Sequence, residues 1–344
     1  MDSLQSILEG NRLAIARGLT QVENDTPHGR AILNSLFPYT GRAPLIGVTG
    51  SPGTGKSSLV NQLARFFRQP SQSVLLGRQL PLRVAVIAVD PTSPFTGGAI
   101  LGDRVRMRDL AGDPGVFIRS MATRGSLGGL SRTTAGMVQV MDAAGYDVIL
   151  IETVGAGQSE VDVARLAHTT LVVEAPGLGD DIQAIKAGIL EIADILVINK
   201  SDRPGAETTE RALRSMLQLA HPVAHVFKHH GQVEQLSTNW VADPQAPLWI
   251  PPIQRTVATE GEGIAELAAA IDHHYQHLCQ TGEWQQREQA RLQSELEALL
   301  QETLVSRWRD SLPEAHYQQV LDCLIRREVS PWQAVEQLID GRPE

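Results

Sequence analysis

The sequence predicts an α/β fold of the P-loop NTPase type, with three layers (α/β/α) around a mostly parallel sheet. Continuous apolar runs such as 84–89 and 195–198 alternate with helical stretches, as expected for strands that are covered on both faces. A glycine-rich loop, residues 50–57, lies between an apolar strand at 45–49 and a helix. Helical segments on both sides of this core predict N- and C-terminal helical extensions.

The glycine-rich loop has the G-x-x-x-x-G-K-[ST] spacing of a phosphate-binding loop. Its residues, with the serine that follows, are Gly50, Ser51, Pro52, Gly53, Thr54, Gly55, Lys56, Ser57 and Ser58. Glycines let successive N–H groups point into one concavity, and the N-terminus of the next helix favours an anion there. We expect Lys56 to reach the β- and γ-phosphates of a nucleotide and Ser57 to ligate Mg²⁺.

Composition limits the classes of protein that remain. The 344 residues, 42% hydrophobic and 20% charged, suffice for one large α/β domain with additions or for two domains. The net charge of -9 disfavours a general nucleic-acid binder. Two cysteines, Cys279 and Cys323, indicate a reducing compartment. Because neither a secretory signal nor an apolar run of ~20 residues is present, we expect a cytoplasmic protein without a membrane span.

Several segments lie outside the regular strand and helix pattern. Residues 2–37 are predicted to form two short helices, and 68–82 and 229–247 are interpreted as surface insertions. The Gly-, Asp- and Arg-rich stretch at 92–132 is typical of switch loops that order around a γ-phosphate. An ordinary irregular connection with solvated arginines is the alternative for that stretch.

Two acidic residues follow predicted strands, at the edge where α/β sheets bind ligands. Asp90 comes after the strand at 84–89, and Glu152 after 147–151. Glu152 is expected to hold Mg²⁺ through a water or to position the attacking water, and Gly155 to offer its N–H to the γ-phosphate. Gln158 is either a residue that orients water or an ordinary polar loop residue.

The sequence Asn199-Lys200-Ser201-Asp202 ends another apolar strand and matches N-K-x-D, the guanine-reading motif of GTPases. The carboxylate of Asp202 can accept from guanine N1–H and N2–H₂, a donor pair that adenine lacks. We expect Asn199 to brace the base loop and the Lys200 stem to cover the base. GTP is therefore favoured over ATP.

From about residue 265 the chain is predicted to be helical to its end. His273, His274, His277 and Cys279 suggest zinc only weakly, because a second ligand cluster is absent from the sequence, and a surface helix is the favoured interpretation. An apolar stripe amid charge at 287–308 indicates either a subunit interface or packing on the same chain.

Together these motifs resemble the MeaB/ArgK GTPases that are associated with methylmalonyl-CoA mutase, a family that includes the human counterpart for cobalamin type A disease. The similar stretches are 89–98, 101–107, 117–125, 152–160 and 179–188. The resemblance implies a SIMIBI-class domain at 41–280, an N-terminal helical extension at 1–40 and a C-terminal helical arm at 281–344 that forms homodimers. It also implies slow GTP hydrolysis and a chaperone role for an adenosylcobalamin-dependent acyl-CoA mutase, gating cofactor loading and protecting the mutase from inactivation.

The resemblance assigns roles to residues outside the P-loop as well. Mg²⁺ is expected at Ser57, Asp90, Asp103 and Glu152, while Gln183 and Lys186, which share one helix face, would couple mutase binding to hydrolysis; the implied catalytic residues are Lys56, Glu152, Gln183 and Lys186. The base-binding loop at Val257, Ala258 and Thr259 departs from the usual Thr-Ser-Ala, because this chain has Thr256-Val257-Ala258. Two alternatives remain: a SIMIBI GTPase for metal-centre assembly, or a kinase that uses the same P-loop.

Overall fold

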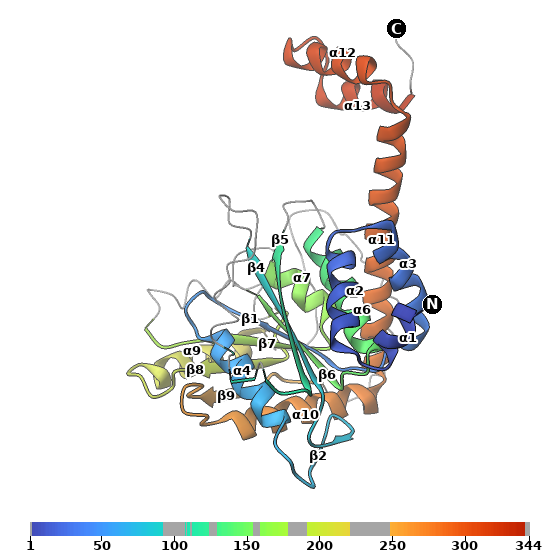
Figure 1. The fold of residues 1–344 in the computed structure, drawn as a ribbon. Coiled ribbons are helices and arrows are strands. Elements are labelled where there is room, and N and C mark those ends of the chain that lie inside the picture. The colour runs from blue at the N-terminus through green and yellow to red at the C-terminus, as the bar shows by residue number, and fades with distance from the viewer. Residues whose placement is uncertain are drawn as a thin grey trace. The chain divides into compact units, whose positions relative to one another are not determined.

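The computed structural model describes residues 2–91, 107, 109–110, 112–123, 129–153, 159–177, 191–220 and 248–340. The chain forms two compact units, Met1–Arg291 and Leu292–Glu344. The first unit contains the sheet and both of its helical layers, and the second is helical (Figure 1).

The first unit is built on a seven-stranded sheet with the order β5-β4-β6-β1-β7-β8-β9. Every pair of neighbouring strands in it is parallel. The strands are β1 (Leu45–Thr49), β4 (Val84–Pro91), β5 (Val116–Thr123), β6 (Val148–Thr153), β7 (Thr169–Glu174), β8 (Ile195–Asn199) and β9 (Ile253–Thr256). The predicted parallel α/β sheet is therefore confirmed. The last strand is shorter than the expected run from residue 249, and an expected strand at 224–227 lies outside the described residues.

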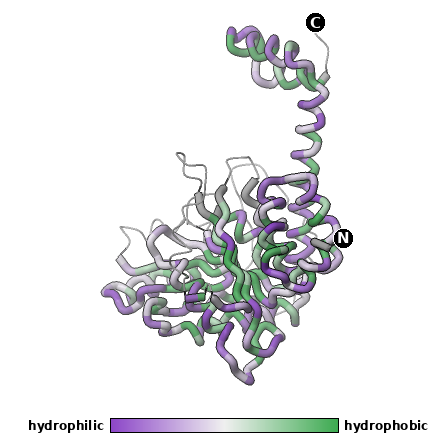
Figure 2. The backbone as a smooth tube through the Cα atoms, viewed as in Figure 1, coloured by the Kyte–Doolittle hydropathy of each residue, from purple (hydrophilic) through white to green (hydrophobic). Residues whose placement is uncertain are grey.

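Helices cover both faces of this sheet, which Figure 2 shows as a largely hydrophobic centre. On one face, α4 (Lys56–Phe67) and α10 (Ile264–Thr281) pack on alternate strand residues such as Val48 and Leu150. On the other face, α6 (Gly129–Ala143), α7 (Ser159–Leu166) and α9 (Ala206–Ala220) lie on the intervening positions, among them Ile149 and Leu196. Because helices cover both faces, a ligand can reach the sheet at the ends of its strands.

The N-terminal helices form a compact group on α6. The structure has three α-helices here instead of the predicted two, because the segment 2–23 is divided at Gly10 and Asn11: they are α1 (Asp2–Leu8), α2 (Arg12–Glu23) and α3 (Pro27–Leu36), followed by the short 3₁₀ helix η1 (Phe37–Tyr39). Asn11 caps α2 by accepting from the N–H groups of Leu13 and Ala14, and Thr26 caps α3. Buried apolar side chains from α1, α2 and α3 join the same core cluster as those of α6. The extension is thus part of the first unit.

The segment at 68–82 corrects one expectation. It contains the small hairpin β2 (Val74–Leu75) and β3 (Arg78–Gln79), and Leu76, Leu80 and Leu82 are buried in the core on the α4 side. The interpretation as a surface insertion depends on Pro and Gly content, which marks turns but does not show where the leucines between the turns lie.

The histidines of α10 correct a second expectation. His274 and His277 are buried, although His273 is exposed. Nδ1 of His274 lies 2.9 Å from the Thr169 hydroxyl, and the Trp249 ring packs against His274 and His277. Among the described residues no group of three or more His, Cys, Asp or Glu could hold a metal ion. These histidines therefore brace α10 against the amino-terminal edge of the sheet.

The second unit consists of the end of α11 (Glu283–Ser311) with α12 (Glu314–Ile325) and α13 (Pro331–Asp340). Ser330 caps α13, with Pro331 at its first position, as the sequence predicts. The first turns of α11 belong to the first unit, where Arg287 donates twice to Asp194, at 2.8 and 2.9 Å. Within the described residues, no helix is both long and apolar enough to cross a membrane.

Candidate functional site

The carboxyl ends of the central strands bring the predicted nucleotide residues together. The glycine-rich loop follows β1, Glu152 lies near the end of β6, and Asn199 is the last residue of β8. The register pairs Val48 with Glu152, and Asn199 with Thr256 on β9. Parallel strands thus deliver residues that are far apart in the sequence to one edge, where open α/β sheets bind ligands.

The loop backbone needs glycine at more than one position. Gly50 has φ 131°, and a Cβ there would overlap the carbonyl oxygen of Val173. Gly55 has φ 93°, and a Cβ there would lie 2.5 Å from Asn199 Nδ2. Gly53, with φ 82°, has open space around it. The glycine spacing therefore reflects close packing at both ends of the loop as well as its left-handed backbone.

Lys56 begins α4, and its ammonium group lies inside the curve of the loop. Its Nζ donates to the carbonyl oxygens of Gly50 at 2.8 Å and Ser51 at 3.0 Å, and the side chain is buried. Thr54, also buried, donates its hydroxyl to the Ser51 carbonyl at 3.0 Å. A cation next to the N-terminus of a helix is a phosphate-binding arrangement.

Ser57 and Glu152 form the oxygen-rich part of the site. The Ser57 hydroxyl donates to Glu152 Oε1 at 2.5 Å, and both side chains are buried. A hydroxyl and a carboxylate beside a phosphate loop fit Mg²⁺, which prefers oxygen ligands and binds through few protein groups plus substrate phosphates. When bound, the ion neutralises charge on the β- and γ-phosphates. Ser57 and Glu152 are the described residues that would hold it.

A pair of buried hydroxyls that sequence reasoning missed lies beside these residues. Thr153, directly after Glu152, donates to the hydroxyl of Thr49, which directly precedes the loop, at 3.1 Å. Both threonines are fully buried. The pair joins the ends of β6 and β1 next to the Ser57–Glu152 contact. A threonine at the end of each strand was the only sequence signal.

Asn199 connects the base side of the site to the phosphate loop. Its Nδ2 donates to the carbonyl oxygen of Thr54 at 2.8 Å. Its Oδ1 accepts from Ala258 N at 3.1 Å and from the Thr256 hydroxyl at 3.2 Å. The side chain is buried, so it fixes three loops relative to one another, and the predicted bracing role agrees with this geometry.

The other residues that are predicted to bind the guanine base lie in the turn after Asn199 and in the loop after β9. Lys200, with φ 56°, donates its Nζ to the carbonyl oxygen of Gly53 at 2.6 Å, so its stem lies over the loop. Asp202 is exposed in the following turn, where it is available to a ligand. Val257 is buried, Thr259 is exposed, and Val257 N donates to the carbonyl of Glu262 at 3.1 Å. Burial explains how an apolar residue is accommodated at 257.

The side chains of the other predicted site residues outside the base loop are not described. The backbone of Asp90 lies in β4, paired with Ala122, at the edge of the sheet that carries the site. Asp103, Gly155, Gln158, Gln183 and Lys186 lie outside the described residues, as does most of the predicted switch stretch at 92–132. Their roles stay predictions.

The fold has three layers around a parallel sheet, its phosphate loop carries Lys56, and Asn199 of the N-K-x-D motif is hydrogen-bonded to that loop. Together these features define a P-loop nucleotide-binding protein of the GTPase type. The family model "Methylmalonyl Co-A mutase-associated GTPase MeaB" matches residues 15–312. The chain belongs to this MeaB family, whose GTPase character indicates guanine-nucleotide binding.

Individual relatives agree with this assignment. The chain is 35% identical to the GTPase ArgK of Escherichia coli, over 98% of this chain and 95% of that protein. It is 30% identical to the mitochondrial methylmalonic aciduria type A homolog of Caenorhabditis elegans, over 97% and 81%. The crystal structure of a LAO/AO transport system kinase matches with TM-score 0.68 and 28% identity, over 99% of this chain and 96% of that one. The chain thus has the fold of the SIMIBI class of P-loop proteins.

Proposed function

We propose that this protein hydrolyses GTP with Mg²⁺ and uses the nucleotide cycle as a chaperone for an adenosylcobalamin-dependent acyl-CoA mutase. In this role it would gate the loading of the cofactor and protect the mutase from inactivation. The observation that carries the nucleotide part is the Asn199 contact, which joins an N-K-x-D base loop to the phosphate loop at Thr54. The partner is supported by the family description and by the similarity to the methylmalonic aciduria type A homolog.

The geometry of the described residues supports the following roles in the site. Lys56 would move from the carbonyls of its own loop to the β- and γ-phosphates, where its charge stabilises the transferring phosphoryl group. Ser57 and Glu152 would hold Mg²⁺. Asp202 would accept from guanine, and Asn199 would keep the two halves of the site in register. Gln183 and Lys186 are proposed to transmit mutase binding to hydrolysis.

The proposal includes a homodimer formed through residues 281–344 and the cytoplasm as the compartment. The domain division 1–40, 41–280 and 281–344 is part of it. Exposed apolar side chains on the second unit support self-association, because a monomer gains nothing from leaving them in water. They include Leu296, Leu300, Leu304, Val305 and Trp332.

Phosphate release from GTP tests this function directly. The purified chain, with Mg²⁺, is titrated with the acyl-CoA mutase of the same organism, and Lys56→Ala is the matched control for contaminating activity. We expect turnover that rises with mutase and is absent in Lys56→Ala. GTP turnover that does not change when the mutase is added would contradict the proposed partner. If the wild-type chain showed no GTP turnover either with or without the mutase, the enzyme assignment would be contradicted.

Phosphoryl transfer to another acceptor is the second candidate, because the similar crystal structure is that of a LAO/AO transport system kinase. The same phosphate loop serves both reactions, so the acceptor distinguishes them. GTP labelled at the γ-phosphate would leave its label on a protein or small molecule if the chain were a kinase, and as free phosphate if it is a GTPase.

A further inference from the structure

Two strand ends beside the nucleotide site are joined by a pair of buried hydroxyls. Thr49 is the last residue of β1 and Thr153 the last residue of β6, and both are fully buried. The Thr153 hydroxyl donates to the Thr49 hydroxyl at 3.1 Å. Within the part of the chain that the structure describes, neither hydroxyl has another partner. Each hydroxyl therefore depends on the other for its hydrogen bond.

The hydroxyl pair and the Ser57–Glu152 contact lie on opposite faces of the sheet. Val48 pairs with Glu152 in the β1–β6 register, and successive side chains of a strand point to opposite faces. Glu152 points to the α4 face, where its carboxylate accepts from Ser57. Thr49 and Thr153 therefore point to the α7 face. Since the β1–β6 register ends at Glu152, the hydroxyl contact holds the two strands together one residue beyond it.

Packing alone does not require hydroxyls at these two positions. The preceding residues of β6 on the same face, Ile149 and Ile151, are buried apolar side chains, and valine is branched at Cβ as threonine is. Replacing both partners of a buried hydrogen bond by apolar groups of the same shape is nearly neutral or stabilising. Two valines would fill the space, but only the hydrogen bond fixes the distance and direction between the two strand ends.

We propose that the Thr49–Thr153 pair positions Glu152 for Mg²⁺ binding and GTP hydrolysis. The Ser57–Glu152 contact holds the strand ends on one face and the hydroxyl pair holds them on the other, which gives the Glu152 carboxylate a fixed place beside the phosphate loop. Both threonines are positioning residues, because they act through Glu152 and through the loop that follows Thr49. A misplacement of about 1 Å can cost about 10²-fold in rate. This inference rests on the proposed GTP hydrolysis and adds two residues on which that reaction would depend.

Valine substitutions separate a positioning role of the pair from a purely structural one. Thr49→Val and Thr153→Val each leave one buried hydroxyl without its partner, so each should lower the Tm of the full chain by about 2–4 °C. The double variant leaves no unsatisfied hydroxyl and should recover the Tm of the wild type. GTP turnover should nevertheless fall by about tenfold or more in all three variants. A double variant that recovers both the Tm and the turnover would overturn the positioning role.

Nucleotide binding supplies a second readout that does not depend on turnover. The affinity for a non-hydrolysable GTP analogue is measured as the Mg²⁺ concentration is varied. In the double valine variant, the Mg²⁺ concentration for the half-maximal gain in affinity should rise by about threefold or more, whereas the Kd without Mg²⁺ should stay the same. Thr49→Ser combined with Thr153→Ser keeps both hydroxyls and should restore the Mg²⁺ response and the turnover. An unchanged Mg²⁺ response in the double valine variant would overturn the proposal.

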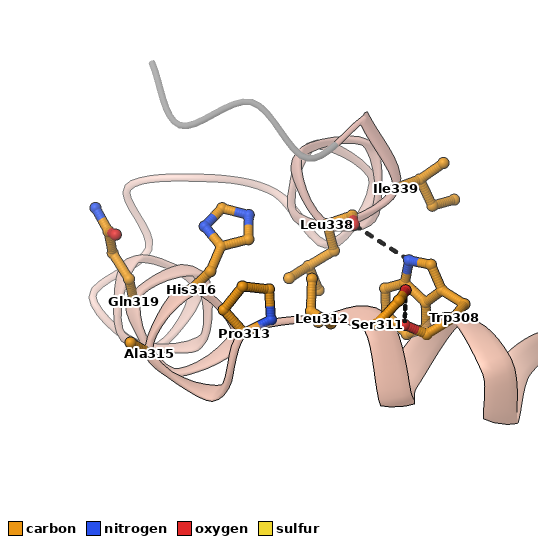
Figure 3. Close-up of a pocket in the computed structure, with 9 residues that line it drawn as sticks. All are labelled: Trp308, Ser311, Leu312, Pro313, Ala315, His316, Gln319, Leu338 and Ile339. Atoms are coloured by element: carbon orange, nitrogen blue, oxygen red, sulfur yellow. Dashed lines mark hydrogen bonds between the residues drawn. The ribbon is translucent and has the colours of Figure 1, made fainter.

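Two control variants remove hydroxyls elsewhere in the chain. Thr169→Val acts at the amino-terminal edge of the sheet, where the Thr169 hydroxyl lies 2.9 Å from Nδ1 of the buried His274, and should lower the Tm without changing turnover. Ser311→Ala removes a hydroxyl of the second unit that donates to the Trp308 carbonyl oxygen at 2.7 Å (Figure 3), and should change neither.

The two readouts also separate this inference from the proposed function. If the wild-type chain does not hydrolyse GTP, the proposed function fails, and the Mg²⁺ response still decides whether the hydroxyl pair positions Glu152. A loss of turnover in Thr169→Val as large as in the double valine variant would show that stability sets the turnover, and would overturn the positioning role.

Discussion

The amide nitrogen of Asn199 donates to the carbonyl oxygen of Thr54 at 2.8 Å, across 145 positions of sequence. Thr54 belongs to the phosphate loop and Asn199 to the base loop, so one buried side chain sets the distance between the two halves of the nucleotide site. The same side chain accepts from Ala258 N. A nucleotide that spans both halves therefore finds them already in register, which lowers the ordering cost of binding.

Asn199→Ala should weaken GTP binding strongly. It leaves the buried Thr54 carbonyl and the Ala258 N–H without their partner, at a cost of about 1–3 kcal/mol for each unsatisfied group. We expect at least about a tenfold rise in the Kd for GTP, measured with a fluorescent nucleotide analogue. Asn34→Ala, at an exposed position of α3, is the control. Equal affinity in the two variants would show that Asn199 does not connect the loops.

Glu152→Gln should change the response to Mg²⁺. The Ser57–Glu152 contact is buried, and removing the negative charge weakens a site built from few protein ligands. The Mg²⁺ concentration for half-maximal GTP turnover should rise by about tenfold or more. Binding of GDP in the absence of Mg²⁺ should be unchanged and serves as the internal control. A parallel loss of both properties would indicate a folding defect instead.

Alanine at two loop glycines should have unequal effects. Gly50→Ala adds a Cβ that overlaps the Val173 carbonyl, whereas Gly53→Ala adds one in open space, and both have positive φ. The second variant should therefore incur only the left-handed backbone cost of about 1–2 kcal/mol, while the first should lose more stability. Thermal unfolding checks this order. Similar Tm values for the two variants would contradict the close approach at Gly50.

Stability should fall as the pH is lowered, because of a buried network at the base of α11. Burial alone would raise the pKa of Glu288, but hydrogen bonds from His168 and Arg291 outweigh it and lower that pKa to about 2, from 4.5. The folded state therefore holds this carboxylate ionised while the unfolded state protonates. The stabilisation is present above about pH 4.5 and is lost as the pH falls towards 2, an effect on the order of 3 kcal/mol.

His168 should cause a further loss of folding stability that begins at higher pH. Its burial lowers its pKa, and its Nδ1 accepts from Leu45 N at 3.1 Å, so the folded state favours neutral histidine. Below its usual pKa of 6.5 the unfolded state binds the proton first, and stability declines. Glu288→Gln should lower stability at pH 7 and flatten its dependence below pH 5, measured by urea unfolding, whereas Glu266→Gln should do neither. An unchanged pH profile in Glu288→Gln would contradict the role of this carboxylate.

The strands and the phosphate loop could be predicted from the sequence because their signals are local. The apolar run at 45–49 and the glycine spacing at 50–57 are complete within a few residues. The four-residue N-K-x-D match became specific because it lies at the end of a predicted strand. The motif predicted that Asn199 braces the base loop, whereas its contact with Thr54 of the phosphate loop depends on how β1 and β8 are arranged in the sheet.

Contacts between distant segments could not be predicted in the same way. His274 and His277 resemble surface residues in the sequence because the groups that cover them, Trp249 and Thr169, lie far away along the chain. Leu76 and Leu82 resemble part of a polar insertion for the same reason. The Thr49–Thr153 hydroxyl pair needs two strands in register before it can be recognised.

Nucleotide discrimination by Asp202 tests the guanine-nucleotide site most directly. Affinities of the wild type and of Asp202→Asn for GTP and xanthosine triphosphate are measured by isothermal titration calorimetry. Because the new amide can donate to the C2 oxygen of xanthine while no longer accepting from guanine, we predict that Asp202→Asn loses GTP affinity and gains affinity for xanthosine triphosphate. Unchanged GTP affinity in Asp202→Asn would show that residues 199–202 and 50–57 do not form one guanine-nucleotide site.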